Sequence, residues 1–424
     1  PDSPVGLDLQ GSAIAILIAH AFFNHAVVVR TVGGLWEGLD PRTEEAARSL
    51  GATRWRAFSG VTLPALRPAI ASAAAITFLF TFTSFGVVRL LGGSARTTIE
   101  VEIYRQTADL LDLPVASVLA LLQLGAVGAM LVAQDRVERR RVAAAVALGP
   151  PRRIRARRAG ERLWLGANLL LLTVFLGLPL ATLVERSFRT GDGHGLSAWR
   201  ALGGVAPESR LFVSPWEAVA NSLRFATLAT LIAVVLGAMA ATALARSEGR
   251  GARFLDGVLL VPLGTSAVTV GFGFLIALDE PVDLRASPWL VPLAQAVVAL
   301  PFVVRTMTPV LRSIDPRLHE AAAVLGASPR QVWRAVDVPL VRRALLVAAA
   351  FAFAISLGEF GATTVIARAD APTVPVTIER LLGRPGSLNA GQAFALSTVL
   401  MVLTATAVVL VDRWRPRRTR GGWE

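Results

Sequence analysis

The residues best suited to do chemistry in this chain are three carboxylates in two different settings. Glu45 and Glu320 occupy the same position in two copies of one stretch, residues 40–64 and 315–339, which align at one offset of 275 residues without a gap. Glu359 lies inside an apolar segment, where a charge is costly and marks a functional residue by default. A carboxylate in either setting offers a negative charge to an arginine partner, a helix end or a cationic solute.

Other familiar chemistries are excluded by residue types that the sequence lacks. The chain contains no cysteine, so it has no disulfide, thiolate metal site or cysteine nucleophile. It also contains no lysine and no G-x-x-x-x-G-K-[ST] loop, so it is not expected to bind and hydrolyse ATP itself. The four histidines are scattered and are interpreted as ordinary helix or loop residues: His20, His25, His194 and His319. The sequence therefore predicts no metal site and no cofactor in this chain.

Each copy of the repeated stretch predicts a short helix, a turn and a second helix. An aspartate followed by proline supplies an N-cap acceptor and a favourable first helical residue, and a later glycine suits the positive φ of a helix C-terminus. A hydroxyl residue then caps the second helix, which a proline is expected to end. These residues are Asp40–Pro41, Gly51, Thr53 and Pro64 in the first copy, and Asp315–Pro316, Gly326, Ser328–Pro329 and Pro339 in the second. We interpret the two copies as a docking surface used twice; the alternative is a pair of loops that only join helices.

The composition indicates a membrane protein. The chain of 424 residues is 54% hydrophobic, with a mean hydropathy of +0.56, which is too apolar for a soluble domain of this length. Its net charge of +13 comes from arginines crowded between or after apolar segments, which is the positive-inside pattern and argues against nucleic-acid binding. Nine apolar segments are long enough to span a bilayer: 11–30, 67–88, 114–134, 163–184, 218–245, 255–278, 289–310, 341–366 and 391–412.

Alternation of these spans places both repeated stretches, the 135–162 loop and the C-terminal tail on one side of the membrane. The arginine excess identifies that side as the cytoplasm. We therefore expect a multi-pass protein of a bacterial plasma membrane, embedded in the lipid bilayer. Contact between the arginines of 135–162 and anionic lipid headgroups is the alternative to a loop that only sets topology.

The repeat extends into the spans and defines two parallel halves. Six spans separate the two copies, and an even number makes the repeats parallel instead of inverted. We assign residues 163–412 to a second domain of six spans, 1–134 to the last three spans of a first domain, 135–162 to an arginine-rich linker and 413–424 to a tail. Three N-terminal spans are therefore expected to be missing, with twelve in the full chain; the alternative is a natural nine-span protein.

Both copies of the repeat resemble the EAA loop of permease subunits of binding-protein-dependent ABC importers. The family pattern is Glu-Ala-Ala, three residues, Gly, nine residues and an apolar-x-apolar-Pro ending, and both copies fit it. The resemblance covers nearly the whole chain and implies an all-α membrane fold of two parallel type I importer permease domains. It also implies docking on separate ATPase subunits, expected to be a homodimer, through Glu45, Ala46, Ala47, Gly51, Glu320, Ala321, Ala322 and Gly326. For the two glutamates, capping of their own helices is the alternative.

Polar residues at matching positions after the two loops are candidates for the translocation pathway. Thr81 and Ser84 in the first half are matched by Ser356 and Glu359 in the second, with Glu359 at the position of Ser84. We expect these four side chains to line a path between the halves. For Glu359, a place at the outer end of its helix in contact with water is the alternative.

The sequence therefore predicts a transport subunit, not an enzyme, that passes a small solute from an external binding protein into the cytoplasm. Residues 356–363 are slightly more similar to iron(III) permeases, so ferric iron is favoured and thiamine comes next; a carboxylate at Glu359 suits either cation. One alternative is an ion-gradient-driven secondary transporter or channel, in which the two helical loops would have no purpose. Another is a membrane enzyme, which would need clustered His, Asp or Glu.

Overall fold

The computed structural model describes residues 11–93, 96–142, 158–190, 193–204, 213–247, 249–279 and 283–414. Side chains are described within these ranges except at 133–142, 190, 253, 260, 263 and 411–414. The described residues are mostly helical. Two strands of two residues each, β1 (Arg189–Thr190) and β2 (Gly193–His194), form an antiparallel pair with Arg189 opposite His194. The expectation of an all-α architecture is thus confirmed.

Contacts divide the chain into two compact units. The first comprises Pro1–Gln106 and Asp112–Ala181, and the second comprises Thr107–Leu111 and Thr182–Glu424. The predicted linker at 135–162 is described only at its two ends, which are helical, and the predicted tail is described only to residue 414. The domain boundaries assigned from the sequence remain a prediction.

The first unit is organised around α1 (Ala13–Gly38), which packs against α4 (Leu63–Phe82) and α5 (Gly86–Leu91). The phenylalanine ring of Phe175 also lies against α1, with its centroid 6.1 Å from that of Phe22. The remaining elements of this part of the chain are α2 (Pro41–Ser49), α3 (Arg54–Ala57), η1 (Phe58–Thr62), α6 (Ile99–Tyr104), η2 (Arg105–Asp109), α7 (Leu113–Val142) and α8 (Ala159–Ser187).

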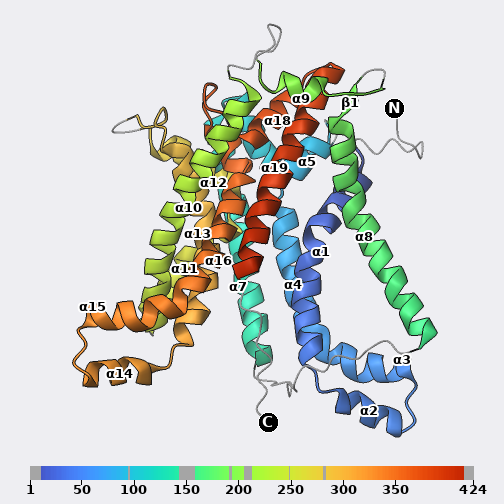
Figure 1. The fold of residues 1–424 in the computed structure, drawn as a ribbon, viewed down its shortest axis with the longest axis vertical. Coiled ribbons are helices and arrows are strands. Elements are labelled where there is room, and N and C mark those ends of the chain that lie inside the picture. The colour runs from blue at the N-terminus through green and yellow to red at the C-terminus, as the bar shows by residue number, and fades with distance from the viewer. Residues whose placement is uncertain are drawn as a thin grey trace. The chain divides into compact units, whose positions relative to one another are not determined.

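The second unit is organised around α13 (Leu290–Arg312), which packs against α10 (Pro215–Arg246) and α16 (Val338–Leu357) (Figure 1). Its other elements are α9 (Ser197–Ala201), α11 (Arg250–Gly264), α12 (Ala267–Ala277), α14 (Pro316–Val324), α15 (Pro329–Val332), η3 (Trp333–Asp337), α17 (Gly361–Ile366), α18 (Val374–Leu382) and α19 (Ser387–Trp414).

A stripe of small residues lets α10 approach α13 closely. Its buried positions follow a spacing of three or four residues and include Ser222, Ala226, Ala229, Ala233, Gly237 and Ala241. A Cβ atom added to Gly237 would lie 2.7 Å from Cγ1 of Val303 on α13, so the contact has no room for a larger side chain. Small residues at helix contacts are typical of membrane proteins, in which close packing replaces the hydrophobic effect between helices.

Within the described residues, eight helices are long and apolar enough to cross a membrane, whereas the sequence predicted nine spans. The difference lies at residues 255–278, which form the two shorter helices α11 and α12. Thr265 between them is extended, and the side chain of Ser266 accepts hydrogen bonds from the backbone N–H groups of Val268 and Thr269 at the start of α12. The hydroxyl thus satisfies amides that a new helix start leaves unpaired.

The prediction that Pro64 and Pro339 end the second helix of each repeat is wrong. Each proline lies in the first turn of the following helix, and a five-residue π-helix, η1 or η3, precedes it. The N–H of Leu63 reaches the carbonyl of Phe58, and the N–H of Val338 reaches that of Trp333. Proline inside a helix lacks an N–H and its ring crowds the carbonyl four residues earlier, and here that residue, Gly60 or Ala335, lies in the wider π-helical turn. The helix therefore continues into the apolar span: Arg54–Phe82 in one repeat and Pro329–Leu357 in the other.

Candidate coupling site

The first repeated stretch folds as the sequence predicts. Asp40 Oδ1 accepts a hydrogen bond of 3.0 Å from the N–H of Arg42 and caps α2. Gly51 has a φ of +90°, a conformation that glycine adopts without the penalty of a Cβ atom. Thr53 Oγ1 then accepts from the N–H of Arg56 at 3.3 Å and caps α3. The predicted caps and the positive φ are confirmed.

The second stretch repeats these features. Asp315 Oδ1 accepts from the N–H of Arg317 at 2.9 Å, and Gly326 has a φ of +80°. At the start of α15 the N–H of Ser328 donates to Oε1 of Gln331 at 2.7 Å, which is half of a capping box. α14 and α15 therefore form a helical hairpin (Figure 1).

The residues predicted to touch a partner lie at the surface. Three in each copy are exposed, and the second alanine in each is half-buried: Glu45, Ala46, Gly51 and Ala47 in the first, and Glu320, Ala321, Gly326 and Ala322 in the second. No residue of α2 or α14 is buried. Each short helix therefore presents small and acidic side chains that a partner can approach.

The structure adds an exposed apolar side chain that sequence reasoning missed. Leu50 is 90% exposed and Leu325 is 87% exposed, and both are the residue directly before the glycine with positive φ. Each of the two turns therefore presents the same apolar side chain to its surroundings. The signal was present in the sequence, because the two leucines are related by the same offset of 275 residues.

Beneath each short helix, a polar side chain contacts the π-helix that follows. In the first unit, Thr62 Oγ1 donates a hydrogen bond of 2.8 Å to Oε2 of Glu44. In the second unit, His319 Nε2 lies 2.8 Å from Oδ1 of Asp337, with the imidazole N–H as donor and the carboxylate oxygen as acceptor. Sequence reasoning missed this contact and treated His319 as an ordinary helix residue.

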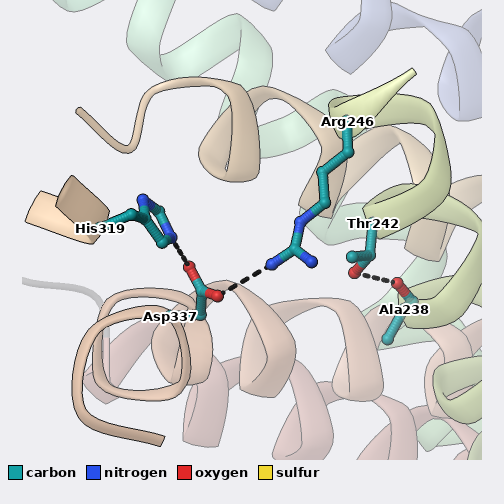
Figure 2. Close-up of polar contacts among 5 residues, drawn as sticks. All are labelled: Ala238, Thr242, Arg246, His319 and Asp337. Atoms are coloured by element: carbon teal, nitrogen blue, oxygen red, sulfur yellow. Dashed lines mark hydrogen bonds and ion pairs between the residues drawn. The ribbon is translucent and has the colours of Figure 1, made fainter. Parts of the chain in front are cut away.

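Asp337 also accepts from α10. Nη2 of Arg246, the last residue of α10, lies 3.0 Å from Oδ2 of Asp337, so one carboxylate stands between His319 and Arg246 (Figure 2). The side chain of Asp337 is only 5% exposed, against 36% for His319 and 62% for Arg246. Nearby, Nη2 of Arg312 donates to the carbonyl of Leu244 at 3.2 Å. These contacts border a cavity of about 830 Å³, which residues of α14, α15, η3 and the ends of α10 and α13 line.

The candidate pathway residues of the first unit have neighbours on their own helix or on α1. Thr81 Oγ1 donates to the carbonyl of Thr77 at 2.9 Å, as hydroxyls in membrane helices often do. Ser84 Oγ lies 3.0 Å from Nε2 of His20, which the sequence analysis had regarded as an ordinary helix residue. The lining role of Thr81 and Ser84 is not tested by these contacts and remains a prediction.

In the second unit Ser356 and Glu359 are both buried. Ser356 Oγ has no hydrogen-bond partner among the described residues. The carboxylate of Glu359 accepts from the N–H of Ala362 at 2.7 Å, from the N–H of Thr363 at 2.9 Å and from the Thr363 hydroxyl. Glu359 therefore caps the start of α17, whether or not it also faces a path.

Within the described residues, no group of three or more His, Cys, Asp or Glu side chains could hold a metal ion. The polar features that the structure brings together are instead the two short exposed helices and the hydrogen bonds beneath them. Exposed helices of this kind can contact a partner protein.

The sequence of this chain is similar to those of known membrane transport proteins. The family model described as "Binding-protein-dependent transport system inner membrane component" matches residues 5–142 and 233–420. The chain is 29% identical over 416 residues to the thiamine transport system permease protein ThiP of Brucella suis biovar 1 (strain 1330), covering 97% of this chain and 73% of the relative. ThiP of Escherichia coli (strain K12) is also 29% identical, over 419 residues, with coverage of 96% and 73%. The molybdenum transport system permease protein ModB of Escherichia coli (strain K12) is 29% identical over 220 residues, which cover 48% of this chain and 95% of ModB.

Proposed function

Because the chain belongs to the family of binding-protein-dependent transport system inner membrane components, we propose that it carries thiamine across the membrane as the permease subunit of an importer driven by separate ATPase subunits. The family establishes the coarser statement: this is a fused, two-domain permease of a type I ABC importer and a multi-pass protein of the inner membrane. The substrate, the partners and the residues that contact them are our proposals.

The proposal for the ATPase partner rests on one observation, the exposure of Leu50 and Leu325 at equivalent positions. Each leucine would enter an apolar groove on one ATPase subunit, and the small alanines beside it would permit close approach. Glu45 and Glu320 would face basic side chains of the ATPase. Two equivalent loops suit two identical ATPase subunits, so we propose a homodimer.

The orientation follows from the same partnership. ATP is found in the cytoplasm, so both short helical hairpins face it, as does the C-terminus. The arginines of residues 135–162 then lie on the cytoplasmic side as well, which agrees with the positive-inside rule. The opposite side receives the solute from an external binding protein.

Thiamine is the substrate that the relatives favour. The two ThiP proteins are similar to this chain over nearly its whole length, whereas ModB is similar to about half of it. These names give no support to the preference for ferric iron in the sequence analysis. Thiamine carries a positive charge, so a path of hydroxyls with a few acceptors suits it.

For the path itself we propose Thr81, Ser84, Ser356 and Glu359. Ser356 has the best support, because its buried hydroxyl finds no partner among the described residues and a buried polar group without one is costly. Glu359 would contribute charge only in part, since α17 already uses both of its oxygens.

Reconstitution in proteoliposomes with the cognate ATPase and binding protein tests this function. We expect uptake of labelled thiamine that needs ATP, persists when a protonophore collapses the ion gradient, and exceeds uptake of ferric iron. Leu50→Asp and Leu325→Asp should abolish ATPase association and uptake. Leu284→Asp is the matched control, because Leu284 is 45% exposed and precedes the opposite end of α13. Uptake that follows the ion gradient instead of ATP would favour a secondary transporter.

A further inference from the structure

We infer that Asp337 is a positioning residue that holds the second docking helix, α14, in place through His319 and ties it to α10 through Arg246. We infer further that Glu44 and Thr62 hold α2 in the first unit with different chemistry. The inference rests on the proposed function, because it assigns the internal support of the surface that would dock on the ATPase.

The two supports occupy equivalent positions. Glu44 matches His319 and Thr62 matches Asp337, both at the offset of 275 residues that relates the two repeats. In each copy the donor and acceptor are 18 residues apart and join the short helix to the last residue of the π-helix. Both bonds measure 2.8 Å although none of the four residue types is the same. In each pair a side chain donates to a carboxylate, which belongs to the short helix in one copy and to the π-helix in the other. The same contact is kept although donor and acceptor have changed places, which indicates that the geometry requires a hydrogen bond here.

A polar support is needed because packing supplies little. No residue of α2 or α14 is fully buried, so apolar burial holds either helix only weakly. The cavity of about 830 Å³ lies between α14 and the ends of α10 and α13, so α14 does not pack closely against these helices there. Asp337 contacts His319 of α14 on one side and Arg246 of α10 on the other, as Figure 2 shows.

The buried carboxylate of Asp337 connects α14 to one particular helix, α10. A carboxylate that is 5% exposed needs donors, and His319 and Arg246 supply one to each of its oxygens. Arg246 is the last residue of α10, a helix of 32 residues. Displacement of the end of α10 is therefore passed through Asp337 to α14. In the first unit, by contrast, the Thr62–Glu44 contact is one hydrogen bond, in which a neutral hydroxyl donates to a carboxylate.

Hydrogen exchange of the full-length permease in nanodiscs tests the support without any transport assay. In Asp337→Ala, backbone amides of α14 should exchange roughly tenfold faster, as expected when a hydrogen bond to a charged group is lost. His319→Ala should have the same effect. It keeps the buried residue Asp337, so it can replace Asp337→Ala in this test if that variant does not fold. Asp283→Asn is the matched control. Its carboxylate pairs with Nε of Arg285 at 2.9 Å in an exposed place before the opposite end of α13.

Placing the residue pair of the first unit in the second unit distinguishes a positioning role of Asp337 from a general effect on stability. Asp337→Thr alone should release α14, whereas His319→Glu combined with Asp337→Thr installs the pair of the first unit and should restore slow exchange. In the complete transporter, the same double variant lacks the carboxylate that Arg246 contacts, so ATP hydrolysis that the loaded binding protein stimulates should stay below that of the wild type. Wild-type exchange in Asp337→Ala and His319→Ala, or no recovery of slow exchange in the double variant, would overturn the inference. A wild-type complex without stimulated ATP hydrolysis would instead refute the proposed function and leave the exchange result valid.

Discussion

Gly271 on α12 lies so close to Ala362 on α17 that an added Cβ atom would stand 2.7 Å from the Ala362 carbonyl oxygen and 2.8 Å from its Cα atom. The neighbour is backbone, so it cannot turn aside as a flexible side chain would. This contact joins the second half of the broken apolar segment to the helix that Glu359 caps.

Gly271→Ala should therefore lower the thermal stability of the protein. We expect a loss of about 1–3 kcal/mol, which is typical of overpacking in a tight contact. Gly273→Ala on the same helix is the control, because a Cβ atom there meets nothing within 4 Å. Thermal unfolding of purified protein in detergent measures both, and equal midpoints for the two variants would contradict the proposed close contact.

The effect of a substitution at Gly326 on activity should depend on how well the new residue tolerates a positive φ, and not on its size. A Cβ atom at Gly326 meets nothing within 4 Å, so its φ of +80° is the only constraint. Gly326→Val should cost about 1–2 kcal/mol locally, while Gly326→Asn should cost less, because asparagine tolerates this region. We expect ATPase stimulation to fall in the order glycine, asparagine, valine. The same order is expected at Gly51; identical activity of the asparagine and valine variants would indicate that the turn does not matter.

Glu359→Gln should separate capping from solute passage. Glutamine keeps one acceptor oxygen but presents an amide N–H to a second donor, so α17 loses one of its caps. We expect destabilisation of about 1–3 kcal/mol. Uptake of labelled thiamine at matched membrane levels then decides the second role. If Glu359→Gln lowers uptake and Gly271→Ala, with a similar loss of stability, does not, Glu359 has a lining position. If both variants lose uptake in parallel, only the capping role of Glu359 is supported.

Ser222→Ala should remove a long-range anchor. Ser222 Oγ on α10 accepts from the N–H of Val374 at 2.8 Å, and both residues are buried. Without the hydroxyl the buried amide has no acceptor, which costs about 1–3 kcal/mol. Ser222→Thr is the control that keeps the oxygen, and unfolding midpoints compare the two. A wild-type midpoint for the alanine variant would show that the amide finds another acceptor.

Single cysteines should map the two membrane faces cleanly, because the chain has none of its own. Ala323 on α14 and Ala286 before α13 are exposed and lie beyond opposite ends of a helix about 35 Å long. In intact cells an impermeant maleimide should label Ala286→Cys, and Ala323→Cys should react only after permeabilisation. Labelling of both from outside would refute the proposed orientation.

The features that the sequence alone determined are local ones. Asp40 and Asp315 cap helices, and Gly51 and Gly326 take positive φ, because each depends on the chemistry of a few neighbouring residues. The apolar spans were recognised for a similar reason, since hydropathy sums over one continuous segment. The family resemblance rests on the same short-range pattern and was confirmed.

Tertiary structure decided which distant side chains meet. Asp337 contacts a histidine 18 residues away and an arginine 91 residues away, and those partners depend on how α10, α14 and η3 are turned about their axes. The π-helices that carry the chain past Pro64 and Pro339, and the break at Thr265, reflect local competition between proline, capping and packing. Hydropathy cannot register that competition, because it sums the apolarity of a segment without regard to the direction in which each side chain points.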